Sequence, residues 1–141
     1  MSDKARVFVD TNVLVYLLSG DAEKAQLAEH VLTRTDIERV ISVQILSEFT
    51  SVARRKSGLD WDAIAEFHEL FRDTCAIVDL RDTDIDEAMI IADRYGFSWY
   101  DCLVLASAGR AHTDMLLSED LQNLQRVGSL SVVNPFSDAR H

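Results

Sequence analysis

Four acidic side chains interrupt apolar runs in this sequence of 141 residues, which is an unusual place for a carboxylate. Asp10 follows VFV, Glu48 lies within ILSEF, Asp101 lies within WYDCLVLA, and Asp120 follows MLLSE. A carboxylate beside a buried segment costs free energy unless a partner compensates its charge. Clustered carboxylates repel one another, so a divalent cation is the usual partner, and an all-oxygen site suits Mg²⁺ or Mn²⁺. Such metals support phosphodiester hydrolysis by activating water and neutralising the phosphate.

The elements around these acids predict that all four face one rim of a sheet. The first acid ends the strand predicted at 7–9, and Asp120 follows the strand predicted at 115–117. Asp101 opens a helix that is apolar nearly all round, and Glu48 lies one turn into a helix that itself follows a strand. In open α/β sheets, ligands bind at the carboxyl ends of the strands. Without a metal, the mutual repulsion is expected to raise the pKa of at least one of these carboxyls.

The order of predicted elements indicates an α/β fold in a single domain, 1–141. Strands are expected at 7–9, 40–42, 76–80, 115–117 and 131–133, and helices at 13–18, 22–32, 43–55, 61–71, 84–95, 98–108 and 121–125. This alternation predicts a central parallel sheet of about four to five strands, flanked by helices. Two of the helices are expected to bury the stripes Trp61, Ile64, Phe67, Leu70, Phe71 and Ile85, Ala88, Met89, Ala92.

Composition and charge narrow the classes of function. Hydrophobic residues make up 48% of the chain, which is typical of a globular protein. The formal net charge of −10 argues against binding nucleic acid through a broad basic surface, but it is compatible with a metal-bridged nuclease or a basic protein partner. No apolar run is long enough for a membrane helix, and the N-terminus has no signal region, so we expect a cytoplasmic protein. Cys75 and Cys102 are expected to be free core residues.

Several motifs, in order along almost the whole chain, resemble those of the PIN-domain nucleases, in particular the VapC-like toxins of toxin–antitoxin pairs. They are VDTNVL, the glutamate of QILSEF, YDCLVLASA, and LLSEDLQ followed by VVNPF. The resemblance implies an endoribonuclease that binds Mg²⁺ or Mn²⁺ through the four matching acids, and it implies an antitoxin partner and a homodimer. Ser118 stands where the family usually has threonine, and Thr11 or Asn12 is expected to orient the first acid or a metal-bound water. The stretch after Asp120 lacks the glycine that often follows LQ in the family.

Simpler interpretations of these residues stay open at this stage. Asp10, Asp101 and Asp120 could each cap a helix, and Glu48 could be a surface residue at the edge of an apolar face. Two further acids that border apolar runs, Asp79 and Asp114, are interpreted as surface residues at strand ends. A basic cluster could contact an RNA backbone or simply end a helix: Arg54, Arg55, Lys56. The histidines show no metal-ligand spacing: His30, His68, His112, His141.

Two other functions compete with a nuclease. An aspartate-nucleophile phosphotransfer protein, such as a haloacid-dehalogenase-like phosphatase, would use Asp10. Those phosphatases have a second aspartate where this chain has Asn12, and they use a late lysine, whereas the last lysine here is Lys56. The third hypothesis is a non-catalytic PIN-like scaffold, but a scaffold has no need to hold mutually repelling carboxylates together.

Overall fold

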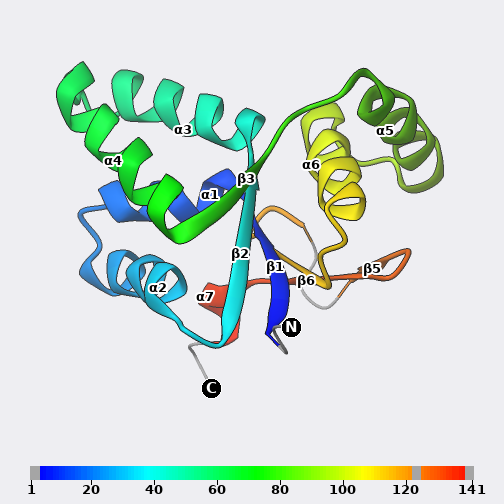
Figure 1. Ribbon diagram of the computed structural model, residues 1–141, viewed down its shortest axis with the longest axis horizontal. Helices are drawn as coiled ribbons and strands as arrows, with labels where there is room; N and C mark the ends of the chain where they lie inside the picture. Colours follow the sequence, from blue (N-terminus) through cyan, green and yellow to red (C-terminus); the bar gives the residue numbers. More distant parts are fainter. Residues whose placement is uncertain (1–3, 122–124, 139–141) are drawn as a thin grey trace.

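The computed structural model describes residues 4–121 and 125–138, and it places helices on both faces of one sheet (Figure 1). The strands are β1 (Ala5–Val9), β2 (Ile37–Ser42), β3 (Cys75–Val78), β4 (Met115–Leu117), β5 (Arg126–Val127) and β6 (Leu130–Val133). The helices are α1 (Thr11–Val15), the short 3₁₀ helix η1 (Tyr16–Leu18), α2 (Ala22–Thr33), α3 (Val43–Arg55), α4 (Trp61–Thr74), α5 (Asp82–Tyr95), α6 (Trp99–Arg110) and α7 (Pro135–Asp138). The helix predicted at 121–125 falls mostly outside the described residues.

The predicted α/β class is confirmed, and the sheet has six strands in the order β3-β2-β1-β4-β6-β5. Neighbouring strands are parallel except for β5 and β6, which form an antiparallel hairpin. The prediction of four to five strands missed β5, because a strand of two residues is too short to show a hydrophobic period. Gly128, with φ of 61°, allows the turn between these two strands.

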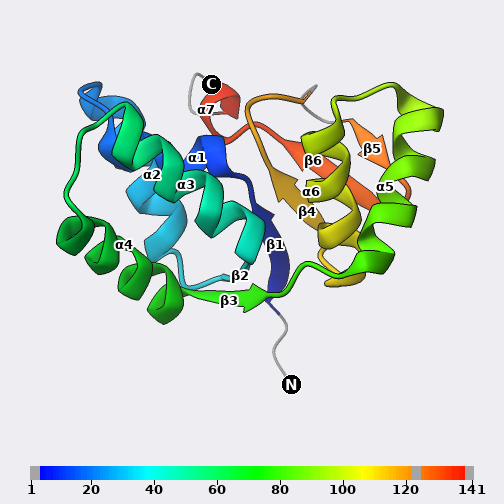
Figure 2. The same ribbon diagram turned by 90° about the horizontal axis from the view of Figure 1, so that it is seen from above.

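The path of the chain explains why the helices form two layers. It moves outward from β1 to β2 and β3 through α1–α4, and then returns through α5 and α6 to place β4 on the other side of β1. Right-handed crossovers in opposite directions put the connecting helices on opposite faces of the sheet. Figure 2 shows α1–α4 on one side of the sheet and α5 and α6 on the other. The point between β1 and β4, where the strand order reverses, is where open α/β sheets bind ligands.

β1 and α6 lie at the centre of the core, in agreement with their nearly continuous apolar sequences. Val7, Phe8 and Val9 are at most 2% exposed, and every residue of α6 from Cys102 to Ala108 is buried. Both cysteines are buried and free, as expected. Among the described residues, no helix combines the length and the apolar character needed to cross a membrane.

The predicted buried stripes of two helices are partly wrong. Trp61 and Leu70 of α4 are exposed, and so are Ile85 and Met89 of α5. In α5 the buried positions are Asp84, Ala88 and Ile91. The buried stripe of α5 was predicted at the wrong positions because the true stripe includes an acid, and apolar spacing does not count an acid as a core residue.

Candidate metal centre

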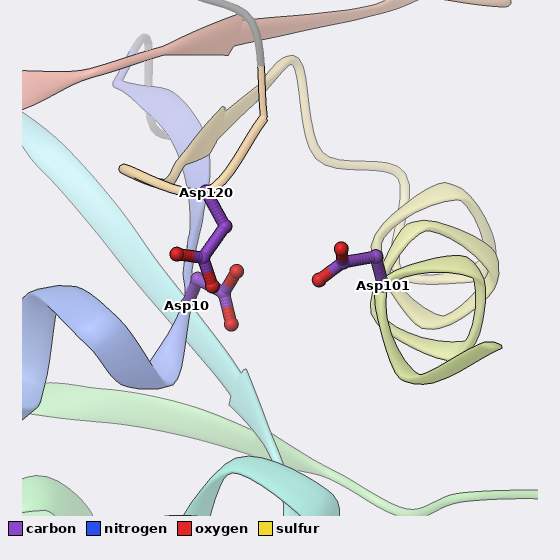
Figure 3. A group of neighbouring side chains, drawn as sticks. All are labelled: Asp10, Asp101 and Asp120. Carbon is purple, nitrogen blue, oxygen red and sulfur yellow. The ribbon is translucent and has the colours of Figure 1, made fainter. Parts of the chain in front are cut away.

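Three of the four predicted acids lie together at the carboxyl ends of β1 and β4. Each of Asp10, Asp101 and Asp120 has a carboxylate oxygen within 4.8 Å of such an oxygen on the other two. In Figure 3 the Asp101 side chain points from α6 toward the other two carboxylates. Two oxygens bound to one Mg²⁺ at about 2.1 Å can be up to about 4.2 Å apart, so small side-chain movements would let all three share an ion. The all-oxygen donor set therefore fits Mg²⁺ or Mn²⁺.

Asp10 is both a helix cap and a member of this cluster. Its Oδ1 accepts a 2.7 Å hydrogen bond from the backbone N–H of Thr11, at the start of α1. Its Oδ2 accepts a 2.9 Å hydrogen bond from Ser118 Oγ. Asp10 directly follows β1 in the chain, and the residue is 5% exposed. The capping interpretation was thus correct, but it does not compete with the functional one.

Asp101 is not the cap of α6, because Ser98 occupies that position. Ser98 Oγ accepts a hydrogen bond from the Asp101 backbone N–H and donates one of 2.8 Å to Asp101 Oδ2. Asp101 therefore lies in the first turn, where the helix dipole stabilises a negative charge.

The turn after β4 is held by a network around one hydroxyl group. Ser118 Oγ accepts hydrogen bonds from Asn12 Nδ2 at 3.2 Å and from the Asp120 backbone N–H at 3.2 Å. Asn12 Oδ1 in turn accepts a 3.0 Å hydrogen bond from the Glu119 backbone N–H. Asn12 and Ser118 thus contact the segments that carry Asp10 and Asp120, which is the geometry needed for the supporting role predicted for them.

Glu48 lies outside the group of three but is connected to it. Its Oε2 accepts a 2.9 Å hydrogen bond from Thr11 Oγ1, and its Oε1 accepts one of 2.8 Å from Gln44 Nε2. Its negative charge contributes to the raised pKa of Asp101, so the two carboxylates are within electrostatic range. A direct role of Glu48 as a metal ligand stays a prediction.

The expected rise in carboxyl pKa is found at two members of the cluster. Burial raises the pKa of Asp10 to about 6, hydrogen bonds from Ser118 and Thr11 lower it in part, and the charges of Asp101 and Asp120 add a smaller rise. Burial also raises the pKa of Asp101, with smaller contributions from the charges of Asp120 and Glu48. The main cause is thus desolvation, and repulsion between like charges is secondary.

The cluster opens to solvent rather than into a closed cavity. Asp10 is buried, Asp101 is half-buried and Asp120 is exposed. A half-open cavity of about 710 Å³ lies elsewhere, lined by α5, α6 and the β5–β6 hairpin, and none of the three carboxylates lines it. An open acidic site suits a phosphate on a large polymer better than an enclosed small molecule.

The predicted RNA-binding cations lie at the far end of α3 from its first turn. Arg54 donates a 2.9 Å hydrogen bond to the carbonyl of Leu59, and its guanidinium lies 4.9 Å from the centre of the Trp61 ring. Arg55 donates to Ser51 Oγ at 3.1 Å. Arg54 therefore helps to join α3 to α4, and contact of Arg54, Arg55 or Lys56 with RNA stays a prediction. Of the four histidines, His141 lies outside the described residues.

Two polar groups in the structure were not predicted from the sequence. Asp84 is buried and accepts hydrogen bonds from Arg110 at 2.8 and 3.0 Å. Glu119 accepts a 2.5 Å hydrogen bond from the hydroxyl of Tyr16. The spacing of Asp84, Ala88 and Ile91 could have indicated a buried acid, but no sequence signal links Tyr16 to Glu119.

The chain belongs to the PIN domain family, since the family model matches residues 7–130. Comparison with curated protein sequences gives no match. The family assignment agrees with the four ordered motifs and with the position of the acids at the edge of the sheet.

Solved structures of toxins share this fold. A toxin–antitoxin complex from Klebsiella pneumoniae matches with a TM-score of 0.68 and 19% identity over 92% of this chain and 97% of that chain. VapC20 of Mycobacterium tuberculosis, described as a toxin that cleaves the sarcin–ricin loop, matches with a TM-score of 0.65 and 18% identity over 81% of this chain and 91% of that one. VapBC2 of Rickettsia felis, bound to a DNA fragment of its promoter, matches with a TM-score of 0.63 and 16% identity over 90% of this chain and 96% of that chain.

Proposed function

We propose that this protein is a metal-dependent endoribonuclease and the toxin of a toxin–antitoxin pair. The observation that carries the proposal is the convergence of three carboxylates, from three separate segments, to within 4.8 Å in a PIN domain. In a chain of net charge −10, a divalent cation is what lets such a site accept a phosphate.

In this proposal Asp10, Asp101 and Asp120 hold Mg²⁺ or Mn²⁺, with Glu48 as the fourth acid. The bound metal would supply an activated water and neutralise charge on the scissile phosphate. Asp10 is kept in place by Ser118 Oγ and by the N–H of Thr11, and Asp101 by Ser98 Oγ. Thr11 and Gln44 each donate to one oxygen of Glu48, which fixes the orientation of its carboxylate beside the cluster.

An antitoxin partner follows from the same chemistry. A free ribonuclease would harm its host, and a basic ligand complements both the net charge and the acidic cluster. The structural relatives described as toxin–antitoxin complexes support this partner. We expect the antitoxin to place an arginine or lysine among the acids, and we expect both proteins in the cytoplasm.

A homodimer is also part of the proposal. The outer face of α5 exposes Ile85, Met89 and Ile90, which lack a covering element in the described residues. Exposed apolar surface of this kind is typical of an interface. Light scattering at high micromolar concentration should give twice the monomer mass, and a monomer at that concentration would contradict this part.

The phosphotransfer alternative finds less support in the site. That chemistry needs a lysine beside the nucleophile. Lys4 precedes β1 whereas Asp10 follows it, Lys24 Nζ donates to the Tyr16 hydroxyl, and Lys56 caps the end of α3. The non-catalytic scaffold is disfavoured by the convergence of Asp10, Asp101 and Asp120 to within 4.8 Å, because a site without function would have no reason to hold three mutually repelling carboxylates together.

The test is RNA cleavage by the purified, partner-free protein. Mg²⁺ or Mn²⁺ should support cleavage of single-stranded or structured RNA, and EDTA should stop it. Asp10→Asn and Asp101→Asn should each lower the rate by about 100-fold or more, since groups that only orient metal ligands already contribute about 10–100-fold. Asp93→Asn, at an exposed position of α5, is the matched control and should cleave like the parent. Equal cleavage by parent and Asp10→Asn would refute the site.

The toxin assignment has a separate test. Expression of the chain alone should arrest growth, and co-expression of the neighbouring gene should relieve the arrest. Arrest that Asp10→Asn abolishes but that the neighbouring gene does not affect would keep the nuclease and reject the pairing.

A further inference from the structure

A tyrosine of η1, a lysine of α2 and a glutamate of the turn after β4 meet next to Asp120 of the acidic cluster. The Tyr16 hydroxyl, in η1, donates a 2.5 Å hydrogen bond to Glu119 Oε1 and accepts one of 3.0 Å from Lys24 Nζ of α2. Lys24 Nζ also lies 3.8 Å from Glu119 Oε2. Glu119 is the residue directly before Asp120, so this contact acts on the turn that carries a proposed metal ligand.

The Asp120 carboxylate depends on its backbone for its position. Within residues 4–121 and 125–138, no hydrogen bond to this carboxylate is present, and the side chain is exposed. The turn itself is fixed at Glu119, whose N–H donates to Asn12 Oδ1 at 3.0 Å and whose side chain is bonded to Tyr16. Glu119 is thus fixed through both its backbone and its side chain, which restricts the direction in which the Asp120 side chain can point.

The Tyr16 side chain is itself well fixed. Its ring packs edge-on against Phe136 with centroids 4.5 Å apart, and Lys24 Nζ lies 4.5 Å from the centre of the same ring. Because the ring is held by these contacts, its hydroxyl reaches Glu119 without losing much side-chain entropy.

We propose that Tyr16, with Lys24, is a positioning residue of the metal centre: it anchors the side chain of Glu119 and so fixes the turn that orients Asp120 toward the ion. This inference rests on the proposed function and adds to it two residues that do not touch the metal. Groups of this kind set the affinity for the metal through the orientation of its ligands. The carboxylate of Glu119 is absent from the group of three that converges, which is consistent with its being drawn toward Tyr16 and Lys24.

The experiment measures Mn²⁺ binding to the EDTA-stripped protein by isothermal titration calorimetry. Tyr16→Phe keeps the ring and removes only the hydroxyl, and it should weaken Mn²⁺ binding by about tenfold. RNA cleavage by this variant should fall at limiting Mn²⁺ and recover at saturating Mn²⁺. Tyr95→Phe is the matched control, because Tyr95, the last residue of α5, packs its ring on Phe97 with centroids 5.4 Å apart. This variant should bind Mn²⁺ with an affinity within twofold of that of the parent.

A double-mutant cycle shows whether the two residues act through each other. Glu119→Met cannot accept the hydrogen bond from Tyr16, so it should weaken Mn²⁺ binding about as much as Tyr16→Phe, and the double variant should be no weaker than either single one. Lys24→Arg should retain more affinity than Lys24→Met.

The outcomes separate this inference from the proposed function. If Tyr16→Phe binds Mn²⁺ within twofold of the parent, the residue is only structural and the inference is overturned, even if the variant melts at a lower temperature. If the parent binds no Mn²⁺, or if binding survives Asp10→Asn unchanged, the metal centre itself is rejected and the inference with it.

Discussion

Ser118 Oγ donates a 2.9 Å hydrogen bond to Asp10 Oδ2, although the two residues lie 108 positions apart in the chain. The contact follows from the parallel register of β1 and β4, in which Val9 pairs with Leu117. Asp10 and Ser118 directly follow this pair and therefore lie side by side. The same hydroxyl accepts hydrogen bonds from Asn12 and from the backbone of Asp120. One buried oxygen thus connects the two segments that carry Asp10 and Asp120.

Removing this hydroxyl should destabilise the protein. Ser118→Ala removes the shortest hydrogen bond to Oδ2 of the buried Asp10 and the acceptor of the Asp120 backbone N–H, so we expect a loss of about 1–3 kcal/mol in the free energy of unfolding. Ser118→Thr keeps the oxygen and should lose less. Ser107→Ala is the matched control: Ser107 is equally buried, but its hydroxyl has no hydrogen-bond partner among the described residues, so its removal should be nearly neutral. Urea unfolding in EDTA measures all three, and equal losses for Ser118→Ala and Ser107→Ala would contradict the role of the network.

Asp10→Asn should stabilise the metal-free protein at pH 7. The pKa of Asp10 is raised to about 6 from a usual value of 3.8, so the native state binds more protons than the unfolded state between these values. Stability contributed by this group is therefore present below pH 4 and is lost as the pH rises through about 6. Asparagine removes the charge at nearly constant shape, and the gain at pH 7 should be on the order of 1–3 kcal/mol.

Thermal unfolding of parent and Asp10→Asn in EDTA between pH 4 and 8 tests this directly. The melting temperatures of the two proteins should approach each other near pH 4 and differ increasingly toward pH 7. Mg²⁺ should raise the melting temperature of the parent by mass action and that of the variant much less. Parallel pH profiles, with equal gains from Mg²⁺, would show that Asp10 does not belong to a metal-binding cluster.

Much of the fold and the three convergent acids could be predicted from the sequence. Nearly continuous apolar runs define β1 and α6, and parallel strands bring Asp10 and Asp120 to the same edge of the sheet. The helix order and the position of Asp101 in the first turn of α6 follow from the same patterns. These features are local, or they follow from a topology that has few alternatives.

The remaining features depend on contacts that have no sequence period. The placement of Glu48 outside the group of three is set by its hydrogen bonds to Thr11 and Gln44. The buried Asp84 was missed because its partner, Arg110, lies 26 residues further along the chain. Likewise, apolar spacing alone could not tell which face of α5 packs against α6, and it assigned Ile85 and Met89 to the core.

The hydrogen bond between Thr11 and Glu48 predicts a selective effect on activity. Thr11→Val keeps the shape of the side chain but cannot donate to Glu48 Oε2, which lies 2.9 Å from the native hydroxyl. RNA cleavage at limiting Mn²⁺ should fall by about tenfold, the lower end of the range for groups that orient metal ligands. Thr11→Ser restores the donor and should cleave within about threefold of the parent. If valine and serine variants cleave equally, the orientation of Glu48 does not matter for the reaction.

The buried pair of Asp84 and Arg110 predicts the largest loss of stability outside the site. Arg110 Nε and Nη2 donate to the Asp84 carboxylate at 2.8 and 3.0 Å, and the Asp84 side chain is only 3% exposed. Burial raises the pKa of Asp84, but the hydrogen bonds from Arg110 and from the backbone N–H of Arg81 lower it by more, so the net pKa is below its usual value. The pair therefore contributes stability above about pH 4, and this stability is lost as the pH falls through the native pKa.

Arg110→Met leaves the Asp84 carboxylate buried without its partner, so we expect a loss of about 3–5 kcal/mol at pH 7. The exposed pair of Arg34 and Asp36, with a shortest distance of 2.7 Å, is the matched control, and Arg34→Met should cost less than about 1 kcal/mol. Without arginine the pKa of Asp84 should rise, so the difference between parent and Arg110→Met should shrink as the pH is lowered below about 4. Urea unfolding at pH 7 and at pH 3.5 gives both quantities. A loss for Arg110→Met that is as small as that for Arg34→Met, or that does not change with pH, would mean that this buried pair does not stabilise the packing of α5 against α6.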